Sequence, residues 1–272
     1  MRLIILFSLV FSVVLLWYLR KHVHRVRREK LFKTPLDASR IAILQKHVTL
    51  YSKLPQTLRE ELHGHINVFL DEKKFIGREG IEITDEMRVV VAGNACLLLL
   101  QGNKRRFTGF SSILIYPNVY VAHEVQHDGL MTTEQPSTRA GESWVRGPIV
   151  LSWANVHSGS VNAEDGHNVV IHEFAHKLDE QSGHMNGLPV LSNEADYKEW
   201  NKVLSEEYNA LHERAQRGEN KVLDAYGTVS PAEFFAVASE SFFEKPMQMK
   251  KKLPELYKQL QIFYNIDPVS WH

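Results

Sequence analysis

The residues with the clearest capacity for chemistry form a His-Glu-x-x-His motif, from His172 to His176, in a chain of 272 residues. On a helix, residues four apart lie on one face, so His172 and His176 can offer two imidazole nitrogens to one metal ion. Zinc bound in this way lowers the pKa of a water molecule to about 7. Glu173 can then take the proton as the water attacks a carbonyl group. The motif therefore predicts metal-assisted hydrolysis with Glu173 as the general base.

The sequence around the motif predicts a buried helix. Apolar residues precede the motif and continue beside it: Val169, Val170, Ile171, Phe174, Ala175 and Leu178. Gly183 stands where such a helix should end. Because the chain holds 14 histidines, the motif alone is only suggestive, and these flanking residues favour a functional site.

A second copy of the bare pattern, His123 to His127, provides an internal comparison. It follows a segment of strand-and-turn composition that ends at Val121, and Gly129 leaves little room for a helix after it. On a strand, residues four apart lie ~13 Å from each other, which is too far for one metal ion to bridge. We therefore interpret these histidines as surface residues near the end of a strand.

A catalytic zinc site normally has three protein ligands and an open position, so a third ligand must come from elsewhere in the chain. The best donor segment begins at Tyr226 and continues into a second apolar helix, with Ser230 as N-cap and Pro231 at the first helical position. Glu233 and Glu240 lie seven residues apart on a face beside its apolar stripe. On this pattern alone, both carboxylates can also be ordinary surface charges.

The chain resembles the Mlc titration factor A family of zinc-dependent peptidases over roughly residues 35 to 268. The matching segments are Gly141 to Trp144, Gly147 to Trp153, Asp165 to Asp179 and Ala232 to Phe243. That family is similar to the catalytic domain of anthrax lethal factor, in which a Tyr-Gly pair stands seven residues before the ligand glutamate. Tyr226 and Glu233 stand in that relation here. The resemblance therefore implies Glu233 as third zinc ligand and Tyr226 as the hydroxyl that stabilises the oxyanion.

The resemblance also implies an α+β fold of the Glu-zincin type that takes a peptide or protein substrate. In such a fold, residues 147–153 are placed as the edge strand that pairs with an extended peptide. One position departs from the wider Glu-zincin pattern, because Val237 stands where an Asp often supports a zinc histidine. A carboxylate in that role fixes the orientation of the imidazole. Asp179 and Glu240 are the two candidates.

The N-terminal segment predicts a membrane anchor. From Leu3 to Leu19, seventeen residues contain only two serines as polar positions, and helix over this length spans ~25 Å. Six Lys or Arg residues follow within eleven positions, which places the remainder of the chain in the cytoplasm. We therefore predict a single-pass helix in the inner membrane with residues 31–272 as the peptidase domain facing the cytoplasm. A cleaved signal peptide and a soluble cytoplasmic protein are the alternatives.

The net charge of zero conceals a basic anchor on an acidic domain. Residues 1–30 hold seven Lys or Arg residues and one Glu, which leaves 25 basic and 31 acidic residues for the remainder. This acidic domain lacks the basic patch that nucleic-acid binding requires. The single cysteine, Cys96, stands in an apolar run and predicts a buried thiol in a reducing compartment.

The remaining pattern predicts one large domain. Helices are expected near residues 37–49, 56–75, 85–101 and 193–217 and from Pro254 onward, and strands near 111–121 and 147–153.

These features favour a zinc metallopeptidase in which His172, His176 and Glu233 hold Zn²⁺, Glu173 acts as base and Tyr226 supports the transition state. Two imidazoles, one carboxylate and an open position suit the tetrahedral preference of zinc. The alternative is a binding protein that sequesters a transcription factor or another regulatory partner, the role that gives the resembled family its name.

Overall fold

A small sheet lies at the centre of the computed structural model, which describes residues 2–102, 105–118, 120–128, 131–139, 141–143, 147–219 and 222–271. Its strand order is β1-β2-β6-β5. The strands β1 (Lys74–Gly77), β2 (Ser112–Tyr116) and β6 (Ile149–Ser152) are parallel, and β5 (Gly141–Ser143) pairs antiparallel with β6. Parallel neighbours need a crossover, and α5 (Asp85–Leu97) provides the one between β1 and β2.

The position of β6 corrects one expectation from the sequence. All four of its residues are buried, and it lies between β2 and β5 within the sheet. Residues 147–153 therefore do not form the edge strand that we predicted for binding an extended peptide. The edge position belongs to β5, a strand of three residues whose pairing partner the sequence did not reveal.

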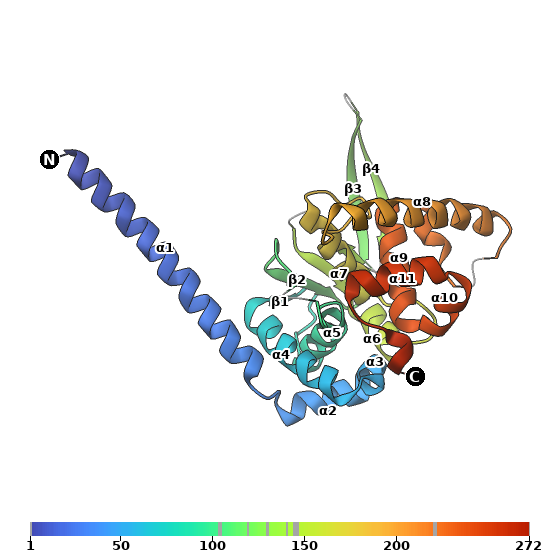
Figure 1. Ribbon diagram of the computed structural model, residues 1–272, viewed down its shortest axis with the longest axis horizontal. Helices are drawn as coiled ribbons and strands as arrows, with labels where there is room; N and C mark the ends of the chain where they lie inside the picture. Colours follow the sequence, from blue (N-terminus) through green and yellow to red (C-terminus); the bar gives the residue numbers. More distant parts are fainter. Residues whose placement is uncertain are drawn as a thin grey trace.

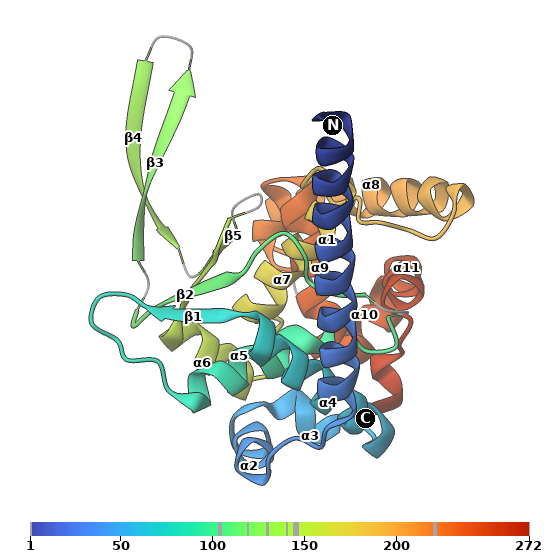
Figure 2. The same ribbon diagram turned by 90° about the vertical axis from the view of Figure 1, so that its left-hand side faces the viewer.

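A separate two-stranded hairpin projects from the sheet side of the molecule (Figure 2). It consists of β3 (Tyr120–Asp128) and β4 (Met131–Arg139), paired antiparallel. The second His-Glu-x-x-His pattern, from His123 to His127, lies within β3, whereas the sequence predicted one strand near 111–121 with this pattern close to its end. The side chains of that pattern lie outside what the structure describes.

Helices make up most of the remaining described chain (Figure 1). Those expected from the sequence are present as α2 (Ala38–His47), α3 (Thr49–Lys53), α4 (Gln56–Glu72), α5, α8 (Glu194–Gln216) and α11 (Pro254–Tyr264). The helices that carry the candidate site are α7 (Val169–Asp179) and α9 (Pro231–Glu244). The helix α6 (Trp153–Val161) follows β6, and α10 (Pro246–Lys252) follows α9. Short 3-10 helices lie at η1 (Glu180–Ser182), η2 (Ala225–Thr228) and η3 (Pro268–Trp271).

The predicted fold class, an α+β zincin with a transmembrane helix, is wrong. The described chain is mostly helical with a small, mainly parallel sheet, and no helix in it is long and apolar enough to cross a membrane. The N-terminal helix α1 (Arg2–Lys33) shows why. Its apolar run from Leu3 to Leu19 is shorter than the about 20 residues that a span requires, and the helix continues directly into basic residues.

The second half of α1 contacts α4. Nε of Arg28 lies 3.3 Å from Oε1 of Glu72, and the Asn67 amide donates to the Thr34 carbonyl oxygen at 2.7 Å. Gly64 of α4 allows the close approach, because a Cβ at that position would lie 2.5 Å from the Phe32 carbonyl oxygen. The C-terminal end of α1 thus packs on the rest of the chain.

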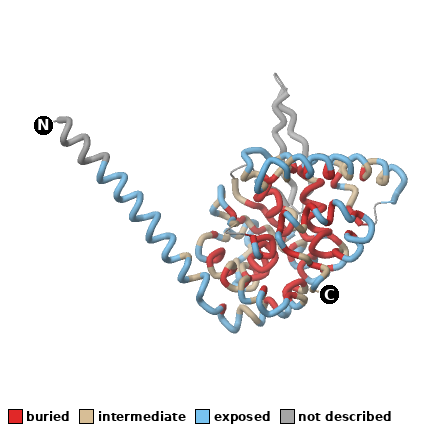
Figure 3. The backbone as a smooth tube through the Cα atoms, viewed as in Figure 1, coloured by how far each residue is buried: buried red, intermediate tan, exposed pale blue. Residues whose placement is uncertain are grey.

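The core lies around α7 and α9, as the buried parts of the chain show (Figure 3). On α7, Phe174 is fully buried and its ring lies 4.7 Å from that of Phe107 and 5.6 Å from that of Phe69. On α9, the Phe235 ring lies 5.7 Å from that of the buried Trp200. Apolar contacts on both helices therefore fix the backbone that presents the His-Glu-x-x-His motif.

A buried lysine links the end of α4 to the segment that leads into β2. The Lys73 ammonium donates to the carbonyl oxygens of Phe107 at 3.1 Å and Phe110 at 2.8 Å, and lies 3.9 Å from the centre of the Phe110 ring. Burial lowers the pKa of Lys73 to about 8. Since Phe107 packs on Phe174, this link also supports α7.

We expect Lys73→Met to lower the free energy of unfolding by about 1–3 kcal/mol, because it leaves the two carbonyl oxygens without their donor. Lys74→Met is the matched control, since the neighbouring Lys74 is exposed and its loss should change stability by less than about 0.5 kcal/mol. Urea denaturation at pH 7 measures both values. Equal stability of the two variants would show that the buried ammonium contributes nothing.

Candidate active site

Two helix N-termini bring the candidate residues together. The helix α7 begins after Asn168, whose side-chain oxygen accepts from the Ile171 N–H at 3.2 Å. The helix α9 begins after Ser230, whose hydroxyl accepts from the Glu233 N–H at 3.2 Å, and Pro231 occupies its first turn as predicted. Because α7 packs directly against α9, the first turn of α9 lies over the face that carries the two histidines.

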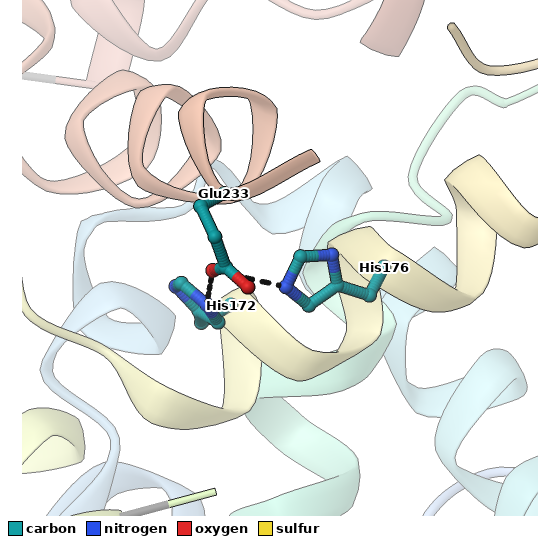
Figure 4. A group of neighbouring side chains, drawn as sticks. All are labelled: His172, His176 and Glu233. Atoms are coloured by element: carbon teal, nitrogen blue, oxygen red, sulfur yellow. Dashed lines mark hydrogen bonds and ion pairs between the residues drawn. The ribbon is translucent and has the colours of Figure 1, made fainter. Parts of the chain in front are cut away.

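The structure places His172, His176 and Glu233 around one point (Figure 4). Nε2 of His172 lies 2.9 Å from Oε2 of Glu233, and Nε2 of His176 lies 3.3 Å from the same oxygen. Their ligand atoms all lie within 4.8 Å of one another. Tetrahedral zinc, with bonds of about 2.0–2.1 Å, needs ligand atoms about 3.3 Å apart. The donor set therefore fits a zinc-sized ion with small side-chain adjustments.

Electrostatics couple the imidazole of His172 to two carboxylates. Burial acts to lower the pKa of His172, but Glu240 and Glu233 outweigh it and raise that pKa well above its usual value. Burial acts in the opposite sense on Glu233, where hydrogen bonds from His172 and His176 hold the pKa well below its usual range. The two carboxylates thus favour positive charge beside them, and a metal ion can supply that charge in place of a proton.

Glu240 contacts the far side of His172. Its Oε1 lies 2.7 Å from Nδ1 of His172, and its Oε2 accepts from the Asn168 N–H at 2.5 Å. Of the two carboxylates that the sequence offered as support for a histidine, Glu240 is the one in direct contact with an imidazole.

A buried polar network fixes the start of α7. The Asn168 amide donates to Asn94 of α5 at 3.0 Å and to Oε1 of Glu244 at 3.1 Å, while Oε2 of Glu244 accepts from the Gly166 N–H. Burial raises the pKa of Glu244 to about 8, and the neighbouring Glu240 adds to this effect. Sequence reasoning missed Asn94, Asn168 and Glu244. The sequence contains one signal for this network: Glu240 and Glu244 are two carboxylates four residues apart on a largely apolar helix.

Asp179, the other carboxylate offered as support, is fully buried at the end of α7. Its Oδ2 accepts from the Gly187 N–H at 2.7 Å. Among the described residues, neither its Oδ1 nor Nδ1 of His176 has a hydrogen-bond partner. Burial raises the pKa of Asp179, although the Gly187 N–H and His176 oppose the rise.

A cavity of about 550 Å³ opens beside His172. Glu173 is buried and lines it together with His172 and Glu240, and Tyr226 lines it from η2. Tyr226 is half exposed, and its ring centre lies 5.9 Å from that of His172. Of the five predicted site residues, His172, Glu173 and Tyr226 line the cavity. His176 and Glu233 do not line it, but their ligand atoms lie within 4.8 Å of that of His172.

Comparison with known proteins agrees with this arrangement. An uncharacterized protein of Synechocystis sp. is 37% identical over 245 residues, covering 89% of both chains. Mlc titration factor A of Yersinia pestis (strain Pestoides F) is 32% identical over 229 residues, which cover 82% of this chain and 83% of that protein. The protein of the same name from Yersinia pseudotuberculosis serotype O:1b matches equally well. The likeness to anthrax lethal factor stays a prediction.

The sequence profile of the glucose-regulated metallo-peptidase M90 family matches residues 22–265, which include both helices of the candidate site. The relatives named Mlc titration factor A confirm the family resemblance found in the sequence. This chain therefore belongs to the M90 family of metallopeptidases.

Proposed function

We propose that this protein is a zinc-dependent peptidase in which His172, His176 and Glu233 hold the metal ion. The observation that supports the proposal is the convergence of their ligand atoms within 4.8 Å, on two packed helices of an M90 family member. Two imidazoles and one carboxylate leave a position open, as catalytic zinc sites require. We place the peptidase domain at residues 31–272 and its substrate, a peptide or protein, in the adjoining cavity.

A bound zinc ion supplies Lewis acidity, which polarises a carbonyl group and lowers the pKa of water to about 7. Glu173 precedes Phe174 on α7 and lines the cavity beside His172, so its carboxylate can accept the proton of an attacking water. Tyr226 lies across the same cavity, where its hydroxyl can donate to the oxyanion that forms on the substrate. Glu173 thus takes up the proton that the water releases, and Tyr226 stabilises the negative charge that forms on the substrate.

Glu240 has a supporting role in the proposal. By accepting the Nδ1–H of His172, Glu240 fixes the tautomer in which the Nε2 lone pair is free to bind the metal. The Asn168 N–H holds the other oxygen of Glu240, so the carboxylate itself is oriented.

The full chain, purified without chelator, should carry about one Zn²⁺ per molecule, and His176→Ala or Glu233→Ala should remove it. Metal analysis by mass spectrometry measures the content, and circular dichroism checks that each variant is folded. Lys177→Ala is unsuitable as a control because that lysine is buried, so exposed Lys198→Ala serves instead. Full zinc retention by folded Glu233→Ala would show that Glu233 is not a ligand.

Glu173→Gln should keep the zinc and the fold but reduce peptide hydrolysis by at least about 100-fold, because it removes the base without removing a ligand. Tyr226→Phe should lose about 10 to 1000-fold, mainly in kcat. A panel of short fluorogenic peptides measures both rates. Unchanged hydrolysis by Glu173→Gln with full zinc content would exclude Glu173 as the base.

Sequestration of a regulatory protein is a second candidate function, and the name of the Yersinia relatives, Mlc titration factor A, favours it. Such a protein can use the same cavity for binding without turnover. The variant Glu173→Gln separates the two functions, because it should abolish a phenotype that depends on hydrolysis and leave one that depends on binding. Sequestration becomes the better account if this variant fully complements a deletion of the gene.

A further inference from the structure

The loop of residues 183–192, between η1 and α8, passes directly over the start of α9. Gly187 in this loop has a φ of +77°, and a Cβ added to it would lie 2.4 Å from the Pro231 carbonyl oxygen and 2.9 Å from its carbon. Pro231 is the first residue of α9 and stands two positions before Glu233. The glycine therefore sets how closely the loop approaches the turn that carries a proposed ligand.

Both backbone polar groups of Gly187 are held by buried side chains. Its N–H donates to Oδ2 of Asp179 at 2.7 Å, and its carbonyl oxygen accepts from the Trp200 indole N–H at 2.9 Å. Asp179 is fully buried, and Trp200 is 1% exposed with its ring against Phe235 of α9. These contacts leave the loop little freedom to move away from Pro231.

Asp179 also belongs to the helix that carries the histidines. It follows His176 by three residues, so the two side chains are neighbours on α7. The His176 imidazole favours the charged form of Asp179. Contacts thus run from Asp179 through Gly187 to Pro231, and Asp179 lies one helical turn from His176.

We propose that Asp179 and Gly187 are positioning residues that fix Glu233 against His176 and thereby set the metal affinity of the site. This inference rests on the proposed metal site, and it assigns an effect on metal affinity to two residues that do not bind the metal. Zinc binds best when its ligands reach their ideal distances, and a displacement of Pro231 moves the backbone from which Glu233 reaches the metal. The link between Asp179 and Gly187 limits that displacement.

Two glycines of the same loop provide a matched test. Gly183 has a φ of +100° and a Cβ there would meet nothing within 4 Å, whereas a Cβ at Gly187 would collide with Pro231. Gly183→Ala and Gly187→Ala therefore share the strain of a side chain at positive φ and differ in the contact with α9. The full chain, stripped with chelator and reloaded, is titrated with Zn²⁺ against a chromophoric chelator, and the thermal midpoint of the metal-free form is recorded.

Gly187→Ala should weaken Zn²⁺ binding by about 10 to 100-fold, the range typical for residues that orient ligands, while Gly183→Ala changes it by less than about threefold. The absorption bands of Co²⁺ bound to Gly187→Ala should also shift, because they report ligand geometry. A role in stability alone would lower the thermal midpoint of both variants and leave their metal affinity equal. That result would overturn the inference.

Asp179→Asn keeps an oxygen for the Gly187 N–H but removes the charge beside His176, and it serves if Gly187→Ala does not fold. We expect about tenfold weaker Zn²⁺ binding with a similar thermal midpoint. Wild-type affinity in Asp179→Asn would remove Asp179 from the inference. A wild-type chain that binds no Zn²⁺ would overturn the proposed metal site itself, whereas equal affinity of wild type and Gly187→Ala would overturn only the role of the link.

Discussion

One partly buried imidazole lies between two carboxylates of a single helix, and the arrangement of the site depends on that contact. His172 of α7 faces Glu233 through Nε2 and Glu240 through Nδ1, and these glutamates stand seven residues apart on α9. Two turns of helix separate them by about 10 Å, enough to place one at each end of an imidazole ring. The contact fixes both the distance and the rotation between α7 and α9, which apolar packing alone leaves adjustable.

Burying these charges is expensive unless every polar atom finds a partner, and the surrounding chain provides those partners. The Asn168 backbone holds Glu240, and its side chain joins Glu244 to Asn94 of α5. The same residue caps α7, so one asparagine serves the helix terminus and the network together. The polar contacts are therefore part of the framework that orients α5, α7 and α9.

Local signals predicted the parts of the site that depend on local geometry. The spacing of His172 and His176 requires only a helix, and the Ser230-Pro231 start of α9 follows from capping preferences. The choice between Asp179 and Glu240 depends on how α9 is rotated against α7, which one sequence does not contain. Hydrogen bonds such as that from Asn168 to Asn94 join residues 74 positions apart and carry no periodic signal.

The errors have physical reasons of the same kind. The apolar run of seventeen residues predicts a membrane span, but α1 is one helix that continues to Lys33 and contacts α4. The internal position of β6 depends on its pairing with β5, three residues whose composition predicts no strand. An apolar composition predicts that a segment is buried, but it does not show which other segment packs against it.

The thiol chemistry of this chain has a consequence for how the proposed site can be lost. The only cysteine, Cys96, is fully buried in α5, and burial raises the pKa of its thiol far above the usual range. Such a thiol stays protonated and resists oxidation. Zinc sites built on thiolates release their metal when an oxidant attacks sulfur, but imidazole and carboxylate ligands offer no such target. Metal supply and acidity, and not the redox state of the surroundings, therefore set the occupancy of a site made from these residues.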